Sequence, residues 1–370
     1  MNLIDKLDKK YLKTVEIIRN EAIKQNSGAF IVGGVVRDLI LGHEIKDIDF
    51  LIEGSAIEFV KSAGFIVKSI HKDFDTAKVI INDEEFDIAS TRIEAYPKKG
   101  GLPNVIQTGV NIKEDLKRRD FTVNAIAYDI IENKTVDEFF GVDDIKNKVL
   151  RVLHNESFID DPTRILRGLD FKYRFDFDFD FETKKLIKEC IQNFDNKDLS
   201  IDRIYLTLNK IFSFPYSNKI LEDIIEDKIY SIWTKNIYIK KEDIKKLDEI
   251  IEIFKLKEKN KFYISAMEAP FFAGAPMRDD FEIYDFYKKM NEIQLALYYF
   301  KTGDKTALRY LEIKDIKTLI NGKDLIDKGF IQGPFIGIIL DDILRQKILN
   351  PSLFKTKEDE MNYVLAHYEP

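Results

Sequence analysis

The chain has 370 residues, of which 45% are hydrophobic and 33% charged, a composition typical of a globular protein with more than one compact domain. Its 65 acidic and 58 basic residues give a net charge of −7, which excludes a surface that is basic throughout but not a local basic groove. Cys190 is the only cysteine, so a disulfide framework and a cysteine-rich zinc site are excluded. With only four histidines in addition, any metal is expected on carboxylate ligands.

No segment has the roughly 18 consecutive uncharged apolar residues that a membrane-spanning helix requires. Residues 1–6 (MNLIDK) include charged side chains and lack the apolar core of a signal peptide. We therefore expect a cytoplasmic protein without a membrane span, and no sequence feature predicts a protein partner.

In chain order, the first periodic segment predicts a helix over residues 7–25. The apolar run at 29–32, the pair Gly33 and Gly34 and the segment behind them predict a strand, a glycine turn and a helix. Residues 45–52 alternate between apolar and polar and predict a second strand. Behind it we expect a helix at 55–63, strands at 64–70, 76–82 and 84–89, and a loop at 96–103.

From about residue 142 the strand patterns fade and helical periodicity dominates. The remainder of the chain is therefore expected to be an all-α array, with helices at 161–175, 182–193, 201–213, 219–229, 241–257, 280–300, 304–311, 335–347 and 356–368.

Two carboxylates, Asp47 and Asp49, lie two positions apart on the second predicted strand and should leave it on the same face. Neighbouring carboxylates repel each other, and a hard cation such as Mg²⁺, which takes oxygen ligands, would relieve that repulsion. The alternative is two solvated acids on an edge strand.

The glycine pair lies just ahead of this strand. Two glycines between a strand and a helix allow backbone N–H groups to approach phosphate oxygens closely. Arg37 follows one turn into the predicted helix and could pair with a triphosphate. The alternative is a turn glycine without a ligand, and the segment contains neither a dinucleotide-binding nor a Walker A motif.

Further motifs follow in a fixed order. Residues 33–38 (GGVVRD) match a GGxVRD motif, 117–125 (KRRDFTVNA) match RRDFTxNA, and 160–167 (DDPTRILR) match (E/D)DPxRxLR. With the Asp-X-Asp pair, they resemble class II tRNA nucleotidyltransferases, the CCA-adding enzymes, and the related bacterial poly(A) polymerases. These enzymes belong to the superfamily that includes DNA polymerase beta. Weaker similarity to their tail domain is found at 321–325 and 333–337.

The resemblance implies an α+β fold with a polymerase-beta-like nucleotidyltransferase head built on a mixed sheet. Residues 1–140 would form this catalytic head, and residues 141–215 a helical neck that recognises the nucleotide base. Residues 216–370 would form a helical body and tail that bind tRNA.

The resemblance also implies roles for individual residues. Asp47 and Asp49 would be catalytic and would hold Mg²⁺. Gly33, Gly34, Arg37 and Arg119 would cradle the triphosphate and ribose, and Asp120 and Asn124 would order the site around the sugar. Asp161 and Arg164 would face the base, with Arg167 nearby. An acid and an arginine offer an acceptor and donors that match the edges of cytosine and adenine and penalise guanine and uracil. The alternative for Asp161 and Arg164 is a helical salt bridge.

Some positions have open roles or depart from the family pattern. Asp87 on the strand at 84–89 could be a general base, a third metal ligand or a structural acid. Asp170 stands where the family usually has arginine, so one phosphate or base contact would be missing or supplied elsewhere. In 200–204 (SIDRI) Asp202 replaces a glutamate, and Thr207 stands where an acid is expected, which bears on nucleotide selectivity.

RNA contacts must come from local basic residues because the chain is acidic, and the candidates are Lys98, Lys99, Lys117 and Arg118. The implied reaction is template-independent addition of C, C and A to the 3′ end of tRNA from CTP and ATP. Segment 92–103 resembles the family's flexible loop, which suggests A addition. An A-adding or CC-adding partial enzyme, a poly(A) polymerase and a non-catalytic RNA-binding protein on the same fold stay open.

Overall fold

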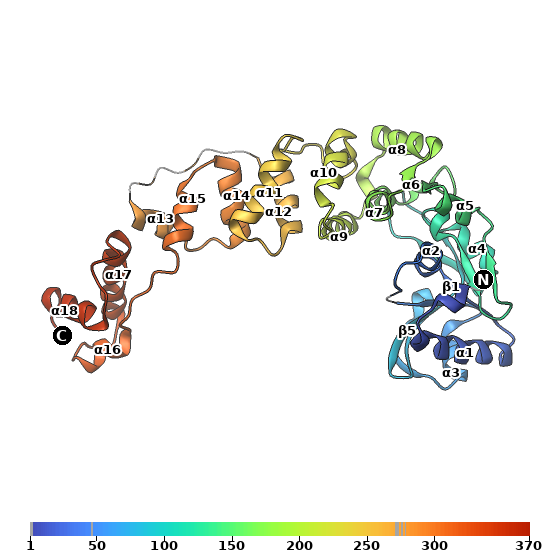
Figure 1. The fold of residues 1–370 in the computed structure, drawn as a ribbon, viewed down its shortest axis with the longest axis horizontal. Coiled ribbons are helices and arrows are strands. Elements are labelled where there is room, and N and C mark those ends of the chain that lie inside the picture. Colours follow the sequence, from blue (N-terminus) through green and yellow to red (C-terminus); the bar gives the residue numbers. More distant parts are fainter. Residues whose placement is uncertain (1–2, 46, 271–273, 275–276, 278) are drawn as a thin grey trace. The chain divides into compact units, whose positions relative to one another are not determined.

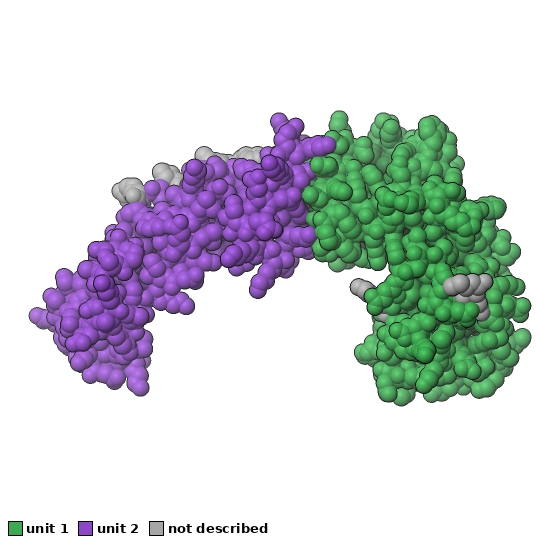
Figure 2. Space-filling view, viewed as in Figure 1, with its two compact units in different colours: residues 1–235 green, residues 236–370 purple. Residues whose placement is uncertain are grey.

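The computed structural model describes residues 3–45, 47–270, 274, 277 and 279–370. The chain forms two compact units, Met1–Lys235 and Asn236–Pro370 (Figure 2). The boundaries expected near residues 140 and 215 subdivide the chain more finely and stay predictions.

The first unit contains a seven-stranded mixed sheet with the order β3-β4-β5-β2-β1-β8-β9, and Figure 1 labels two of its strands, β1 and β5. Within the sheet β2 and β5 pair in parallel and the other neighbours are antiparallel. The mixed sheet confirms the predicted α+β class. The strands are β1 (Gly28–Val32), β2 (Asp49–Glu53), β3 (Ile66–His71), β4 (Thr76–Ile81), β5 (Glu84–Ser90), β8 (Ala127–Asp129) and β9 (Lys134–Val136).

Helices α1 (Lys9–Lys24) and α3 (Ala56–Ser62) pack against this sheet, close to their predicted ranges (Figure 1). The buried residues of α1 include Tyr11, Val15 and Ile18, which share one helical face because of their spacing. Helix α2 (Gly34–Leu41) follows the glycine turn after β1, as predicted. Short 3-10 helices occur at η1 (Leu3–Lys6), η2 (Lys72–Phe74), η3 (Thr122–Asn124), η4 (Asn196–Asp198) and η5 (Ile229–Ile232).

Two expectations for the head need correction. The predicted strand at 45–52 begins only at Asp49, so Asp47 precedes β2. The predicted loop at 96–103 connects a hairpin that was not predicted, formed by β6 (Arg92–Ala95) and β7 (Asn104–Thr108). Both hairpin strands are short and only partly buried, which weakens the alternation that identifies a strand.

The segment beyond residue 142 is not purely helical. Strands β10 (Val149–Leu150) and β11 (Asp178–Phe179) form a small parallel sheet. Strands of two residues are too short for a recognisable pattern. Gly168 makes room for this sheet, because a Cβ there would lie 2.5 Å from the ring of Phe179. Its helices are α6 (Ser157–Asp160), α7 (Thr163–Phe175), α8 (Phe181–Asn193), α9 (Ile201–Ile211) and α10 (Ser217–Glu226), and two shorter helices, α4 (Ile112–Lys117) and α5 (Gly141–Lys146), come before them in the chain.

The described part of Asn236–Pro370 is helical, as expected. The helix predicted over 280–300 is two helices. The first ends at Tyr287, and the side chain of Asn291 caps the start of the second. Helices α12 and α16 were not predicted. The elements are α11 (Asp243–Phe254), α12 (Lys259–Glu268), α13 (Asp280–Tyr287), α14 (Glu292–Thr302), α15 (Thr306–Ile313), α16 (Gly322–Asp327), α17 (Pro334–Leu349) and α18 (Lys357–His367).

The last three helices pack around an apolar cluster that includes Leu325, Ile339 and Val364. Fully buried Glu360 accepts hydrogen bonds from the backbone N–H groups of Leu319 and Ile320 at 2.6 and 2.9 Å, so its charge is compensated. Throughout the described ranges, no helix is both long and apolar enough to cross a membrane.

Candidate nucleotide-binding site

A cavity of about 430 Å³ in the first unit is the candidate site. It contains every residue that the sequence predicted to bind nucleotide: Gly33, Gly34, Arg37, Arg119, Asp120, Asn124, Asp161, Arg164 and Arg167. Its other lining residues are Glu94, Tyr96, Arg118, Asp170, Phe171, Arg174 and Lys210. Residues from distant parts of the sequence thus meet in one place, while their individual roles stay predictions.

The glycine turn forms one end of this cavity. Gly33 has φ +68° and ψ −126°, a conformation that side-chain-bearing residues rarely adopt. A Cβ on Gly33 would lie 2.6 Å from Nη1 of Arg119, so the turn also needs glycine for close approach. Gly34 begins α2, which places the N–H groups of the first helical turn beside the cavity.

Arg37 is buried in the cavity wall with only 4% of its surface exposed. Its Nε lies 2.9 Å from Asp38, and its Nη1 donates to Oδ1 of Asn124 at 2.5 Å. The guanidinium also lies 4.2 Å from the ring centre of Phe175. Burial lowers the pKa of Arg37, and the charge of Asp38 opposes that shift. Arg37 is therefore a fixed part of the wall.

Asp115 organises the two arginines of the RRD motif, and sequence reasoning missed it. This fully buried carboxylate accepts from Arg118 at 2.8 Å and from Arg119 at 3.1 Å. Burial alone would raise the pKa of Asp115, but the charges of Arg119 and Arg118 outweigh it and lower the pKa. Glu94, also missed, accepts from Arg118 at 3.2 Å. Asp115 lies three residues before Arg118, the first residue of the RRD motif, and this proximity is the sequence feature that could have indicated its role.

Asp161 pairs with an arginine that the prediction did not include. Its carboxylate accepts from Nη2 of Arg203 at 2.6 Å and from the backbone N–H of Thr163 at 3.0 Å. Arg167 lies at 3.5 Å. Burial tends to raise the pKa of Asp161, but Arg167 and Arg203 together lower it, so the group stays ionised. Arg203 follows Asp202 in the SIDRI segment, so the resemblance of that segment to the family pattern could have indicated a role for Arg203.

Arg164 does not form the helical salt bridge considered as the alternative. It donates to Oγ of Ser157 at 2.7 Å and to the backbone oxygen of Arg118 at 2.9 Å. A third bond reaches the hydroxyl of Tyr96 at 3.3 Å. Its Nε, like that of Arg119, is buried and has no hydrogen-bond partner within the described structure. An unpaired buried donor costs about 1–3 kcal/mol, so these two N–H groups favour a ligand that brings acceptor oxygens or nitrogens.

A continuous polar network joins these groups. Asp120 accepts from Nδ2 of Asn124 at 2.9 Å and from Nε of Arg167 at 3.1 Å. Burial would raise the pKa of Asp120, yet the charge of Arg167 and the bond from Asn124 lower it. The network runs through Arg37, Asn124, Asp120, Arg167, Asp161 and Arg203.

The predicted metal-binding carboxylates lie outside the cavity lining, around the start of β2. The parallel pairing of β2 with β5 places Asp49 opposite Asp87, so both lie on one face of the sheet. The Asp49 residue is exposed, but partial desolvation by surrounding protein atoms and the charge of Asp87 raise the pKa of its carboxyl, with Asp47 contributing in the same direction. Because Asp47 precedes the strand, strand alternation does not explain its position. Asp87 is ion-paired with Lys78 at 2.9 Å.

These carboxylates suit a hard cation in their chemistry. The raised pKa of Asp49 reflects partial desolvation and like-charge repulsion, and a divalent ion would offset the repulsion. Within the described residues, no group of three or more His, Cys, Asp or Glu side chains is arranged so that it could hold a metal. The Mg²⁺ site on Asp47 and Asp49 therefore stays a prediction.

Comparison with known proteins finds similar sequences and folds. Residues 29–151 match the model of the poly A polymerase head domain. A solved CCA-adding enzyme in apo form II superposes with a TM-score of 0.78 at 25% identity, over 98% of this chain and 97% of that chain. The chain is thus similar to CCA-adding enzymes in its fold and to the poly A polymerase head domain over residues 29–151.

The relatives differ in how much of their length is shared. The A-adding tRNA nucleotidyltransferase of Aquifex aeolicus is 40% identical over 54% of this chain and 26% of that protein. The CCA-adding enzyme of Streptococcus gordonii is 29% identical over 80% of this chain and 69% of that protein. The chain spans less than half the length of the three A-adding relatives that it matches.

The structure also places the predicted RNA contacts. Arg118 lines the nucleotide cavity. Lys98 pairs with Asp198 at 3.2 Å, and Lys117 pairs with Glu114 at 2.6 Å. These two lysines and Lys99 are exposed, so they are available to a large ligand. Their role in RNA binding stays a prediction.

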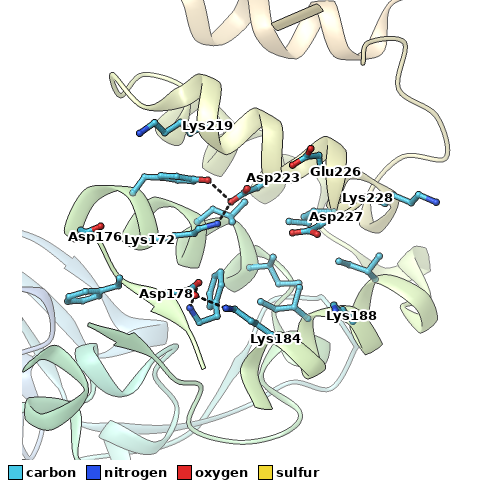
Figure 3. Close-up of a pocket in the computed structure, with 18 residues that line it drawn as sticks. Lys172, Asp176, Asp178, Lys184, Lys188, Lys219, Asp223, Glu226, Asp227 and Lys228 are labelled. Atoms are coloured by element: carbon cyan, nitrogen blue, oxygen red, sulfur yellow. Dashed lines mark hydrogen bonds and ion pairs between the residues drawn. The ribbon is translucent and has the colours of Figure 1, made fainter. Parts of the chain in front are cut away.

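A larger cavity, of about 760 Å³, lies among α7, α8 and α10 (Figure 3). None of the residues predicted from the family motifs lines it. Two of its lysines are neutralised: Lys172 pairs with Asp223 and Lys184 with Asp178, each at 2.6 Å. Size alone therefore does not identify the functional site.

Proposed function

We propose that this protein adds nucleotides to the 3′ end of tRNA without a template, using CTP and ATP and building the sequence CCA. The observation that carries this proposal is the single cavity in which the predicted nucleotide-binding residues meet, with two buried arginine N–H groups left unpaired. Support also comes from similar structures described as CCA-adding enzymes with CTP, with ATP and with tRNA.

In this proposal the glycine turn and Arg119 bind the triphosphate. The absence of a side chain at Gly33 allows phosphate oxygens to approach the backbone. The 3′-hydroxyl oxygen of the RNA bonds to the α-phosphorus in line, and the bond from that phosphorus to the leaving pyrophosphate breaks. Asp120 and Asn124 keep the surrounding side chains in place during this exchange.

Base selection is assigned to Asp161 and Arg164. Asp161 stays ionised because Arg167 and Arg203 lower its pKa, so it can accept from the amino group of cytosine or adenine. Arg164 offers the unpaired Nε–H to a ring nitrogen or carbonyl acceptor of the base. Guanine and uracil present the opposite pattern at these atoms and would leave groups unpaired.

Asp47 and Asp49 are proposed to hold Mg²⁺ ions, and Asp87 would join them if it released Lys78. When bound, Mg²⁺ would stabilise charge on the phosphates and lower the pKa of the attacking hydroxyl in a two-metal arrangement. The contribution of the chain is to fix Asp49 and Asp87 on adjacent strands.

The larger organisation is also proposed from the family. Residues 1–140 would form the catalytic head and residues 141–215 the base-recognising neck. Residues 216–370 would bind the tRNA body by shape, largely through phosphates and 2′-hydroxyls. Lys98, Lys99 and Lys117 would add phosphate contacts near the head.

A second candidate function is that of an A-adding enzyme, which adds the final A to a tRNA whose 3′ end is CC. It is favoured by the A-adding relatives, which are 37–42% identical, compared with 29% for the Streptococcus gordonii CCA-adding enzyme. Full CCA addition is favoured by the match to CCA-adding structures over 98% of this chain.

The test incubates the purified chain and Mg²⁺ with three tRNA transcripts, which lack CCA, end in CC, or end in CCA. Each nucleoside triphosphate is supplied separately and CTP and ATP together. Full CCA addition predicts extension of the first two transcripts and none of the third. Extension of only the CC end indicates the A-adding enzyme, and long A tails on any RNA indicate a poly(A) polymerase. RNA binding without pyrophosphate release would refute catalysis.

A further inference from the structure

The cations that line the nucleotide cavity fall into two groups. Arg37, Arg118, Arg119, Arg164 and Arg167 each donate hydrogen bonds to protein acceptors. Arg174 and Lys210 are exposed, and within the described residues neither side chain has a hydrogen bond or an ion pair. They are therefore the two exposed cations of this cavity whose charge no described protein acceptor compensates.

The fold brings these two cations to the same cavity. Arg174 lies in the last turn of α7, and Lys210 lies in the last turn of α9. The two helices pack together, and Asp161, which lies two residues before α7, forms an ion pair with Arg203 in the first turn of α9. Arg174 shares the Phe175 ring with Arg37, at 5.0 and 4.2 Å from the ring centre, so positive charge is concentrated there.

Asp170 places a carboxylate at the end of the cavity where Arg174 lies. It lies one helical turn before Arg174, lines the same cavity and is 4% exposed. Its Oδ1 accepts from the hydroxyl of Tyr216 at 2.6 Å. The motif resemblance predicts an arginine at this position, whereas Asp170 is an acid that anchors Tyr216, the residue that precedes α10. The wall at this position therefore carries negative charge and cannot attract a phosphate.

We propose that Arg174 and Lys210 together form the phosphate contact that Asp170 does not supply. This inference rests on the proposed function and identifies the ligand group as a phosphate oxyanion. The phosphate belongs either to the nucleoside triphosphate or to the last phosphodiester of the RNA. A guanidinium and an ammonium both bind phosphate strongly, and exposed cations lose little hydration when they do so.

The test measures equilibrium binding of ATP with Mg²⁺ and, separately, of a tRNA transcript that lacks CCA. The variants are Arg174→Gln, Lys210→Gln and the double variant. A lost charge-assisted contact should weaken binding about tenfold per residue. If the triphosphate is the source, only ATP binding weakens. If the RNA is the source, RNA binding weakens and the slope of log affinity against log salt falls by about one per residue.

The matched control is Lys188→Gln, which removes the same charge from an exposed lysine of α8 that lines the separate cavity of Figure 3. It should leave both affinities unchanged, and Arg174→Lys should retain part of the binding because it keeps the charge. Unchanged affinities in the double variant, or an equal loss in Lys188→Gln, would overturn the contact. Thermal unfolding of each variant verifies that the fold is intact.

Binding is measured without turnover, so the result is separable from the proposed reaction. A wild-type chain that binds both ligands but extends no tRNA refutes the reaction, and the variants still test the contact. A wild-type chain that binds neither ligand refutes the contact, whatever the extension assay gives.

Discussion

Two groups of carboxylates in the first unit are in opposite electrostatic states. At the start of α7, arginines surround Asp161 and lower its pKa. At the start of β2, Asp49 is partly desolvated beside Asp87 and its pKa is raised. Protein cations outweigh the burial of Asp161, whereas the charges of Arg119 and Lys78 near Asp49 do not outweigh its desolvation and the charge of Asp87. Side chains that recognise a base select it better when their positions are fixed by the protein. Carboxylates that bind a metal ion need oxygen atoms that no protein cation already occupies.

The largest effect is expected for Asp49→Asn. If Asp49 holds Mg²⁺, extension of tRNA should fall roughly a thousandfold. Folding should be unaffected or slightly favoured near neutral pH, because the replacement removes a charge whose pKa is raised. The measurements are single-turnover extension and thermal unfolding.

The control for this experiment is Asp143→Asn, which removes an exposed acid that pairs with Lys146 on α5. It should retain wild-type activity. Full activity in Asp49→Asn would show that the β2 carboxylate is not part of the catalytic centre.

Asp161→Asn tests the compensated group. Loss of one partner from a buried ion pair typically costs about 3 kcal/mol, and Arg203 would lose its charged acceptor. Both the free energy of unfolding in urea and the preference for CTP and ATP should fall. Its neighbour Asp160→Asn is the matched control and should change stability by less than about 0.5 kcal/mol. Equal stability of the two variants would contradict the assigned role of the network.

Gly33→Ala should have a smaller effect, of about 2 kcal/mol, because alanine is strained at φ +68° and its Cβ would collide with Arg119. Gly42→Ala has a similar φ of +74° but meets nothing within 4 Å, so it should cost only about 1 kcal/mol. Urea unfolding and ATP binding separate the two variants. If both lose the same stability and neither loses ATP binding, the turn does not require close approach.

The smallest effect concerns pH. Asp115, Asp120 and Asp161 have lowered pKa values in the folded state, so their stabilisation is present above the unfolded carboxyl pKa of about 3.9 and is lost as the pH falls through the folded values. Asp49 has a raised pKa and acts in the opposite direction, so its destabilisation disappears on acidification. Urea unfolding between neutral and acid pH should show Asp120→Asn with a flatter profile than the wild type. An identical profile would contradict this assignment.

Sequence motifs predicted the contents of the cavity because each motif contains residues that the chemistry restricts. The glycine turn, the RRD segment and the DDPTR segment all line it. The motifs did not predict the residues that form ion pairs with the charged side chains of the site. Asp115, Glu94 and Arg203 act by matching a neighbour's charge, and the spacing between partners is set by the fold rather than by local pattern.

Secondary structure was predictable where a pattern extends over several turns, as in α1 and α8. It failed where a short element depends on tertiary packing. The pair β10 and β11 has two residues in each strand, and the break before Asn291 depends on a cap within an otherwise continuous apolar pattern. For Asp47, the strand assignment failed because β2 begins at Asp49, four residues later than the alternation suggested.

The chain of contacts from Arg37 to Arg203 has a consequence for redesign. Asp120 and Arg167 each join two neighbours, so a single replacement leaves more than one charged or polar group uncompensated. The losses of stability from two replacements within this polar network should therefore not be additive. Replacing both partners of one contact should cost less stability than replacing either partner alone. Redesign of the base preference is therefore best started at an end of the network, such as Arg203, because only its bond to Asp161 within the network would have to be replaced.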